Sequence, residues 1–216
     1  DYYLEELEEV RKKLGLDNFY LVGHSWGGLL AQEYALKYGE HLKGLVVFSM
    51  IDNIEEYTTH INKLREEMFN SLEVQYMKDV EEAKNFDDPM YQELLKKLYA
   101  KYVTRHPKVS HMVNTMATDV YNYFQGNNEF VMVGTLNGWS VRDKLANVKV
   151  PTLLTFGEFD TMPLDVARRM QDTLPNSRLV LTPDGGHCHN EDNPEAFFKS
   201  LYKFVSEVEN GTFGKE

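Results

Sequence analysis

Gly-His-Ser-Trp-Gly-Gly, at residues 23–28, follows directly on the apolar run Phe-Tyr-Leu-Val at residues 19–22. A Gly-x-Ser-x-Gly pattern between a strand and a helix is typical of a nucleophile elbow, a sharp turn that exposes its serine. The turn crowds the backbone, so we expect a side chain at position 23 or 27 to collide with the neighbouring strand or helix. Residues 18–22 are predicted to form a buried strand, and the residues from Leu29 onward a helix with one apolar face. These flanking elements favour an elbow over a glycine-rich turn with an idle serine.

The segments outside the elbow alternate between helix and strand. Apolar periodicity predicts helices over 3–14, 164–174 and 194–208, and strands over 42–50, 152–156 and 178–181. Continuous apolar strands that alternate with helices are typical of a parallel sheet covered on its faces. The fold class predicted from this alternation is α/β.

The middle of the chain has a different pattern and composition. From about residue 53 to residue 125 the sequence is rich in Glu, Lys, Tyr and Met, with apolar residues at three- and four-residue steps. No convincing strand occurs in this stretch, so we interpret it as a helical insertion. The predicted organisation is a core over 1–52, a helical cap over 53–137 and a second core segment over 138–216.

Composition and charge exclude several classes of partner. The 216 residues, 42% of them hydrophobic, suffice for one sizeable core. A net charge of −11 argues against nucleic acid or an anionic membrane surface as a partner. No apolar run approaches the roughly 20 residues that span a bilayer, and nothing resembles a signal peptide. The single cysteine, Cys188, excludes an intrachain disulfide, which fits a cytoplasmic location.

The sequence also contains an acid and a base in the order that an elbow serine requires. A serine hydroxyl needs a base to take its proton, and the base needs a carboxylate to fix its tautomer. The expected chain order is serine, then aspartate or glutamate, then histidine. Asp160 ends the strand and turn of residues 153–160, and His187 follows the next strand. Both positions fall at the carboxyl edge of the sheet. We therefore expect Ser25 as the nucleophile, His187 as the general base and Asp160 as its orienting acid.

Each of these assignments has an alternative. Asp160 also suits the cap of the helix that follows it, and His187 could be an ordinary loop histidine. Asp184 lies three residues before His187, but in the same loop it is less able to reach behind the imidazole. Asp52 ends the preceding strand and is a further candidate for the acid.

The stretch His-Cys-His at 187–189, with Asp192 close by, resembles part of a metal site. The sequence contains no further ligand cluster, and His-x-His in a loop is weak evidence. We expect neither a metal nor another cofactor. Cys188 lacks the elbow geometry, so we prefer Ser25 as the nucleophile.

Several motifs occur in a fixed order that runs essentially from end to end. They are Gly-His-Ser-Trp-Gly-Gly at 23–28, Gly-x-x-Glu-Phe at 126–130, Gly-Thr-Leu-x-x-Trp at 134–139, Val-Pro-Thr-Leu at 150–153, Gly-Glu-Phe-Asp at 157–160 and Gly-Gly-His at 185–187. This ordered set resembles the proline iminopeptidase (prolyl aminopeptidase) branch of the α/β-hydrolases. The resemblance implies an α/β-hydrolase fold with an inserted helical cap. It also implies a serine hydrolase that cleaves a small peptide or amino-acid amide after a free N-terminal residue, through an acyl-enzyme.

The resemblance assigns two further residues. The backbone amide of Trp26 is implied to donate to the oxyanion. Glu129 is implied to bind the ammonium group of the substrate, although the family usually has proline where this chain has Asn127. Many members carry a second glutamate directly after the aspartate, where this chain has Thr161. We therefore expect Glu129 to carry most of the amine recognition alone. Without the flanking motif, a solvated surface glutamate would be the preferred interpretation.

One part of the family pattern is missing from this sequence. The family begins with several strands and a His-Gly-Gly-Pro-Gly loop that supplies half of the oxyanion hole. This sequence begins with Asp1, at the helix before the elbow. We expect an upstream segment or a complementary chain to complete the sheet beside residues 19–22, since an exposed apolar sheet edge is avoided in proteins.

Two other functions fit the same sequence. An esterase or lactonase would use the same elbow and acid–base pair, because the fold does not fix the substrate. An inactive fragment or binding module is the third interpretation, and only the missing first half of the sheet favours it.

Overall fold

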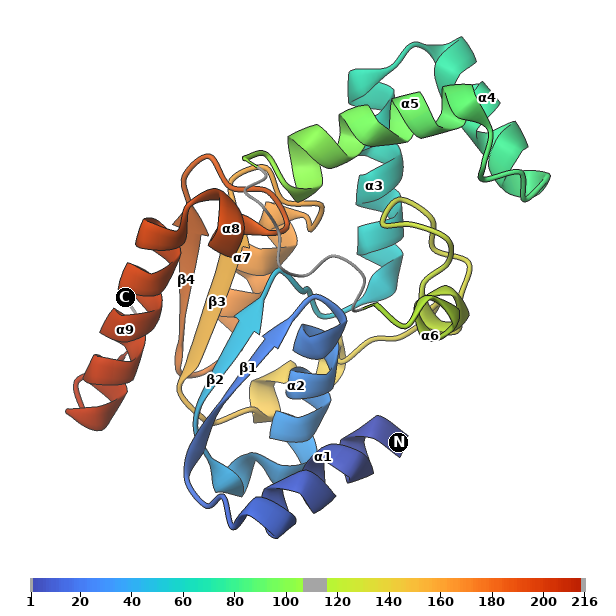
Figure 1. Cartoon of the computed structure of the whole chain (residues 1–216). Helices are drawn as coiled ribbons and strands as arrows, with labels where there is room; N and C mark the ends of the chain where they lie inside the picture. Colours follow the sequence, from blue (N-terminus) through green and yellow to red (C-terminus); the bar gives the residue numbers. More distant parts are fainter. Residues whose placement is uncertain (1, 107–115, 215–216) are drawn as a thin grey trace.

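The computed structural model describes residues 2–106 and 116–214. Within these residues the core is a four-stranded sheet in the order β1-β2-β3-β4, and every neighbouring pair is parallel (Figure 1). The strands are β1 (Phe19–His24), β2 (Leu42–Phe48), β3 (Thr152–Gly157) and β4 (Ser177–Thr182). The helices of the core are α1 (Tyr2–Leu14), α2 (Trp26–Tyr38), α7 (Leu164–Thr173), α8 (His189–Asp192) and α9 (Pro194–Glu209). The predicted α/β fold is confirmed, and each predicted strand and helix outside the insertion is present. Their ends differ by two residues or fewer, except that α2 begins at Trp26, three residues before the predicted start at Leu29.

Helices cover both faces of this sheet, because successive side chains of a strand point to opposite faces. Val46 of β2 and Leu153 of β3 pack with Phe204 of α9 on one face. Their neighbours Val47 and Leu154 belong to a larger cluster that includes residues of α2 and α7 on the other face. The three-layer arrangement is visible in Figure 1, with α9 and α2 on opposite sides of the strands. This arrangement gathers the carboxyl ends of all four strands at one edge.

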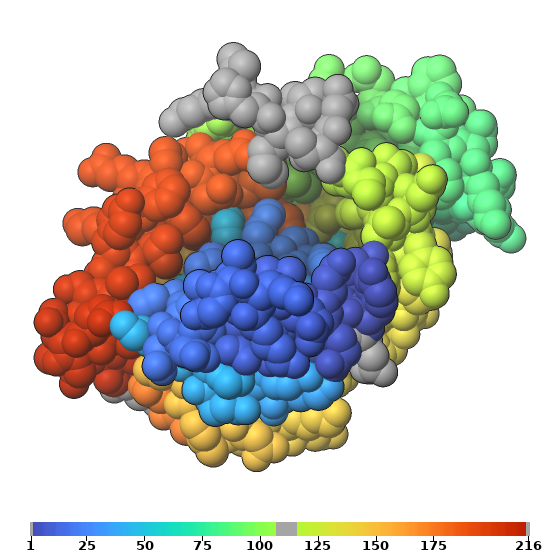
Figure 2. Space-filling view, turned by 60° about the horizontal axis from the view of Figure 1, so that its bottom comes forward, coloured from blue at the N-terminus to red at the C-terminus, as the bar shows by residue number. Residues whose placement is uncertain are grey.

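Strand β1 lies at one side of the sheet and pairs with β2 alone among the described residues. Its Val22 is 48% exposed, whereas β2 and β3 have buried apolar residues on both faces. In Figure 2 the blue N-terminal residues lie in front, between the red C-terminal helix and the green cap. The expectation that an upstream segment or a second chain completes the sheet beside β1 stays a prediction.

The described part of the middle segment, residues 53–106 and 116–137, contains helices. They are α3 (Ile54–Met68), α4 (Ser71–Glu82), α5 (Pro89–Leu98) and α6 (Thr118–Phe124), and a short helical turn at Tyr99–Val103 follows α5 directly. Two further helical turns, Gly39–His41 and Arg142–Asn147, lie outside this segment. The side chains of Asn53, Asn70 and Asp88 accept backbone N–H groups at the first turns of α3, α4 and α5. Such caps satisfy amides that have no partner within the helix. None of the described helices is long and apolar enough to cross a membrane.

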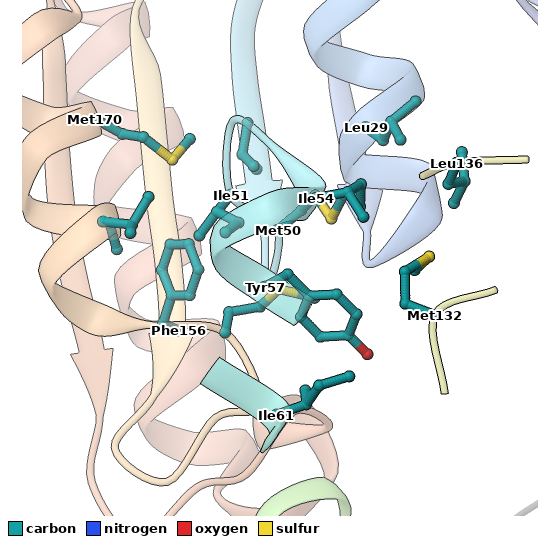
Figure 3. Packing of buried hydrophobic residues seen from close by; sticks show 14 of the residues in the cluster. Leu29, Met50, Ile51, Ile54, Tyr57, Ile61, Met132, Leu136, Phe156 and Met170 are labelled. Carbon is teal, nitrogen blue, oxygen red and sulfur yellow. The ribbon is translucent and has the colours of Figure 1, made fainter. Parts of the chain in front are cut away.

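The cap segment leaves the core and rejoins it at one place. Asn53 and Ser140 form an antiparallel bridge, flanked by hydrogen bonds from Ile54 N to Trp139 O (3.0 Å) and from Val141 N to Asp52 O (2.8 Å). The apolar core continues from the sheet into the cap without a break, as Figure 3 shows for side chains such as Met50, Ile54, Tyr57 and Ile61. The base of α3 is therefore fixed to the elbow side of the sheet.

Candidate active site

Ser25 occupies the sharp turn between β1 and α2. Its backbone has φ 53° and ψ −121°, a conformation that costs energy for any residue with a side chain. The turn is held by a hydrogen bond from Ser25 N to Phe48 O (2.9 Å), and α2 begins at the next residue, Trp26. A strained serine between a strand and a helix is the geometry expected of a nucleophile elbow.

The glycines around Ser25 are not equally crowded. A Cβ atom at Gly23 would lie 2.1 Å from the carbonyl oxygen of Gly27, so the prediction for position 23 is confirmed. The prediction for position 27 is wrong, since a Cβ there meets nothing within 4 Å among the described residues. The second close approach falls at Gly28, where a Cβ would lie 2.6 Å from Cβ of Met50. The reason is that Gly28, one residue further along α2, lies on the side of the helix that packs against the residues following β2.

A matched pair of substitutions tests this packing. Gly23→Ala forces a Cβ atom into backbone and should lower the free energy of unfolding by about 1–3 kcal/mol or more. Gly27→Ala places a methyl group in open space within a helix and should leave stability unchanged or raise it by up to about 1 kcal/mol. Urea unfolding midpoints at neutral pH measure both. Equal destabilisation by the two variants would contradict the packing described.

The predicted acid and base are in contact. Nδ1 of His187 lies 2.9 Å from Oδ1 of Asp160, and both side chains are buried. Burial alone would raise the pKa of Asp160, but the charge of His187 and the hydrogen bonds from His187 and Ser49 hold it below its usual range. Asp160 is therefore ionised and fixes the Nδ1–H tautomer of His187.

Ser49 is part of this site, and the sequence analysis did not identify it. Its hydroxyl donates to Oδ2 of Asp160 (2.6 Å) and lies 3.2 Å from Nδ1 of His189. Backbone N–H groups of Gly157 and Met162 also donate to the Asp160 carboxylate, at 3.2 and 3.1 Å. The signal was a lone serine in the apolar run Val-Val-Phe-Ser-Met, at the carboxyl end of β2. Ser49 has a φ of 50°, which marks the position as constrained.

The alternative carboxylates have other partners. Asp184 is exposed and pairs with Arg105 and His106, at 2.8 and 2.6 Å. Asp52 is buried and pairs with Arg169 at 2.9 Å. Asp160 caps no helix, since α7 begins after Pro163 without a side-chain cap. The contacts favour Asp160 as the partner of the base.

His189 and Asp192, which resembled part of a metal site in the sequence, have hydrogen-bond partners in different parts of the structure. Nδ1 and Nε2 of His189 lie within hydrogen-bond distance of the hydroxyls of Ser49 and Thr155, at 3.2 and 3.0 Å. Asp192 accepts backbone N–H groups from Arg105, His106 and Gly186. The described part of the chain contains no cluster of three or more His, Cys, Asp or Glu side chains that could hold a metal ion.

Ser25 and Glu129 line the same cavity, of about 250 Å³, between the elbow and the cap. Its wall is mostly apolar and aromatic, and it includes Trp26, Tyr57 of α3 and Tyr121 of α6. Ser25 and His187 are not hydrogen-bonded to each other: Nε2 of His187 is buried and has no hydrogen-bond partner among the described residues. Hydrogen bonds of this kind are often long in structures without substrate.

Glu129 is not a solvated surface residue. It is 9% exposed, and its Oε1 accepts hydrogen bonds from Tyr57 (3.1 Å) and Thr161 (3.2 Å). Tyr121 donates to Oε2 at 3.3 Å, and the backbone N–H of Glu129 donates to the hydroxyl of Tyr99 at 3.0 Å. Sequence reasoning found the carboxylate but none of the hydroxyl groups that hold it.

The three tyrosines around Glu129 remain protonated at neutral pH. Burial, and then the charge of Glu129, raise the pKa of Tyr57, Tyr99 and Tyr121 above its ordinary value. The hydroxyl groups that donate to the carboxylate are therefore neutral, and the nearest cationic group among the described residues is the imidazole of His187, when protonated, at 3.6 Å. No lysine or arginine among the described residues pairs with Glu129, and a buried carboxylate of this kind suits a cationic ligand.

Comparison with known proteins identifies the family. A family model for the alpha/beta hydrolase fold matches residues 1–194. The proline iminopeptidase of Flavobacterium johnsoniae is 30% identical over 96% of this chain and 72% of its own length. That of Elizabethkingia meningoseptica is 31% identical over 99% of this chain and 74% of its own length. The chain belongs to the proline iminopeptidase family of α/β-hydrolases. It is therefore a hydrolase.

Solved structures agree with this family and its fold. A crystal structure of proline iminopeptidase from Mycobacterium smegmatis superposes with a TM-score of 0.81 and 25% identity, over 96% of this chain and 71% of the other. The crystal structure of VinJ superposes with a TM-score of 0.87 and 24% identity, over 95% of this chain and 71% of the other. At that identity the second likeness concerns the α/β-hydrolase fold alone.

Proposed function

We propose that this hydrolase is a serine aminopeptidase that cleaves the amide or peptide bond after a free N-terminal amino acid, as a proline iminopeptidase does. The observation that carries the proposal is the buried carboxylate of Glu129 in the cavity that also holds Ser25. A carboxylate placed there recognises an ammonium group next to the bond under attack. An esterase or lactonase has no need of such a group.

The proposed chemistry follows from the contacts around the elbow. Ser25 attacks the scissile carbonyl, and Nε2 of His187 takes the proton of its hydroxyl. Asp160 holds the imidazole in the required tautomer and stabilises the imidazolium. His187 then gives its proton to the leaving amine, which leaves an acyl group on Ser25. Water, activated by the same histidine, attacks this ester and regenerates the serine.

The oxyanion formed in both steps needs hydrogen-bond donors. Trp26 is the first residue of α2, so its backbone N–H has no acceptor within the helix and lies at the positive end of the helix dipole. We assign this amide as one donor of the oxyanion hole. Removing one such donor in comparable enzymes lowers turnover by about 10²–10³.

The cavity also fits the side chain of a small apolar N-terminal residue. The rings of Trp26, Tyr57, Tyr121 and Phe124 line it together with Glu129. Aromatic faces attract an ammonium group and pack against an aliphatic ring such as that of proline. The proposed substrates are therefore short peptides or amides with a free, uncharged-side-chain residue at the N-terminus.

A panel of three substrates tests the function. We expect the protein to hydrolyse prolyl anilide, and to hydrolyse its N-acetylated twin at least a hundredfold more slowly in kcat/KM, because the acetyl group removes the charge that Glu129 binds. A short-chain ester serves as the third substrate. Preference for the ester over both anilides would favour an esterase, and no hydrolysis of any would favour a binding module.

Glu129→Gln tests the residue that carries the proposal. Its kcat/KM for the free-amine anilide should fall at least tenfold, because a charge-assisted contact of about 1.5–3 kcal/mol is lost. The kcat/KM for the ester should stay unchanged when wild type and variant are each measured at a pH high enough that kcat/KM no longer rises with pH. Glu158→Gln is the matched control, since the Glu158 side chain is exposed and, among the described residues, accepts the backbone N–H of Asp184 and no other hydrogen bond. An equal fall for anilide and ester would show that Glu129 does not bind the amine.

A further inference from the structure

Glu129, which lines the cavity, lies next to the buried His187. Oε1 of Glu129 lies 3.6 Å from Nε2 of His187, and the two side chains are only 12% and 4% exposed. The hydroxyl of Thr161 connects them, since it donates to Oε1 of Glu129 at 3.2 Å and lies 3.1 Å from Nδ1 of His187. The imidazole is thus enclosed by two carboxylates, Asp160 at Nδ1 and Glu129 at Nε2.

Three other titratable groups near His187 among the described residues, those of His24, His189 and Cys188, carry no charge at neutral pH. The ring of His24 lies 4.9 Å from that of His187, between ring centres, and burial lowers the pKa of His24 to about 3. Burial also lowers the pKa of His189 to about 4. The next residue in the chain is Cys188, and burial raises the pKa of its thiol to about 12. Among the described residues, the charges that act on His187 are those of Glu129 and Asp160.

These two carboxylates favour the protonated imidazole. Burial alone would lower the pKa of His187, but Glu129 and then Asp160 raise it to about 9. Below that pH the ring is an imidazolium, which cannot accept the proton of Ser25. At neutral pH a base with this pKa is unprotonated, and able to accept a proton, in only a minor fraction of molecules.

We infer that Glu129 has two alternative cationic partners, the imidazolium of His187 and the ammonium group of the substrate, so that binding of the amine releases His187 as a neutral base. This inference rests on the proposed amine-binding role of Glu129. When the ammonium group pairs with Glu129, the carboxylate no longer stabilises the proton on Nε2. That proton leaves to water through the cavity, and Nε2 is free to take the proton of Ser25.

The coupling makes amine recognition part of the chemistry. A substrate without an ammonium group leaves Glu129 paired with the imidazolium, so it would be hydrolysed only as the pH approaches the pKa of His187. Linkage also requires the reverse effect: protonation of His187 weakens amine binding by the same factor by which the amine weakens proton binding. Amine affinity should therefore rise with pH across the titration of His187.

Pyrrolidine is a suitable probe, since it presents a secondary ammonium group and has no bond to cleave. The experiment follows the imidazole of His187 by ¹⁵N NMR as the pH is varied, with and without saturating pyrrolidine, and assigns the signal by its loss in His187→Gln. We expect pyrrolidine to lower the pKa of His187 by at least one unit in the wild-type protein. The affinity for pyrrolidine should rise at least tenfold from pH 6.5 to the upper end of the titration.

Two variants separate the coupling from a general charge effect. Glu129→Gln should have a lowered pKa of His187 without any ligand, and pyrrolidine should change it no further. Glu158→Gln removes a negative charge from the same edge of the sheet, at an exposed position, and should behave like wild type. A similar fall in the pKa of His187 in both variants would contradict the inference.

The wild-type titration decides the matter even if Glu129→Gln does not fold. Pyrrolidine that binds without changing the pKa of His187 overturns the coupling and leaves the proposed function standing. Pyrrolidine that does not bind at all overturns both. A lowered pKa of His187 on binding, together with pH-dependent affinity, supports both.

Discussion

Ser25→Ala should abolish covalent labelling by a fluorophosphonate probe and lower kcat by about 10⁶, the loss seen when the nucleophile is removed from comparable serine hydrolases. The expectation rests on the strained turn that presents Ser25 to the cavity. Among the serines that the structure describes, Ser25 alone combines an elbow conformation with a place in the cavity that Glu129 also lines. Active-site labelling followed by mass spectrometry, and steady-state hydrolysis of a prolyl anilide, measure the two effects.

Ser71→Ala is the control for this experiment, because Ser71 is exposed at the start of α4 and remote from the elbow in sequence. It should be labelled and should turn over at the wild-type rate. Circular dichroism should show unchanged helix content in both variants. A probe adduct that persists in the Ser25→Ala protein would mean that another residue is the nucleophile.

Asp160→Asn should lower kcat by about 10⁴, as loss of the orienting carboxylate does in comparable sites. All four hydrogen bonds to the carboxylate are donated by its neighbours, from His187, Met162, Ser49 and Gly157. His187 and Met162 donate to Oδ1, and Ser49 and Gly157 donate to Oδ2, so the amide NH₂ group of an asparagine must face one of these two pairs. When the NH₂ group faces His187, it donates to Nδ1 and the imidazole carries its proton on Nε2. Nε2 then cannot accept the proton of the nucleophile.

Asp184→Asn is the matched control, since it makes the same chemical change three residues before His187. Its carboxylate is exposed and paired with Arg105 and His106, so we expect activity within a few-fold of wild type. Steady-state kinetics on the anilide compare the two variants. An inactive Asp184→Asn beside an active Asp160→Asn would reverse the assignment of the acid.

Local sequence determined most of the fold. Apolar periodicity gave the strands and the longer helices of the core to within three residues, because burial on one or both faces leaves a period that can be read from neighbouring positions. It did not give the four-residue helix α8. The order of Ser25, Asp160 and His187 was also readable, since each follows a strand and the carboxyl ends of parallel strands meet at one edge. The family resemblance, confirmed by its relatives, added the carboxylate of Glu129.

Contacts between distant segments were decided only by the tertiary structure. Ser49 reaches Asp160 across 111 positions of sequence, and the hydroxyl of Tyr57 reaches Glu129 across 72. Crowding falls on Gly28 and spares Gly27, which depends on the side of α2 that faces β2. The 3.6 Å approach of Glu129 to His187 depends on how the cap sits on the sheet edge. Periodicity records which face of an element is buried, but it carries no information about which residue of another element lies opposite, because strand register and cap placement are set by packing across the whole chain.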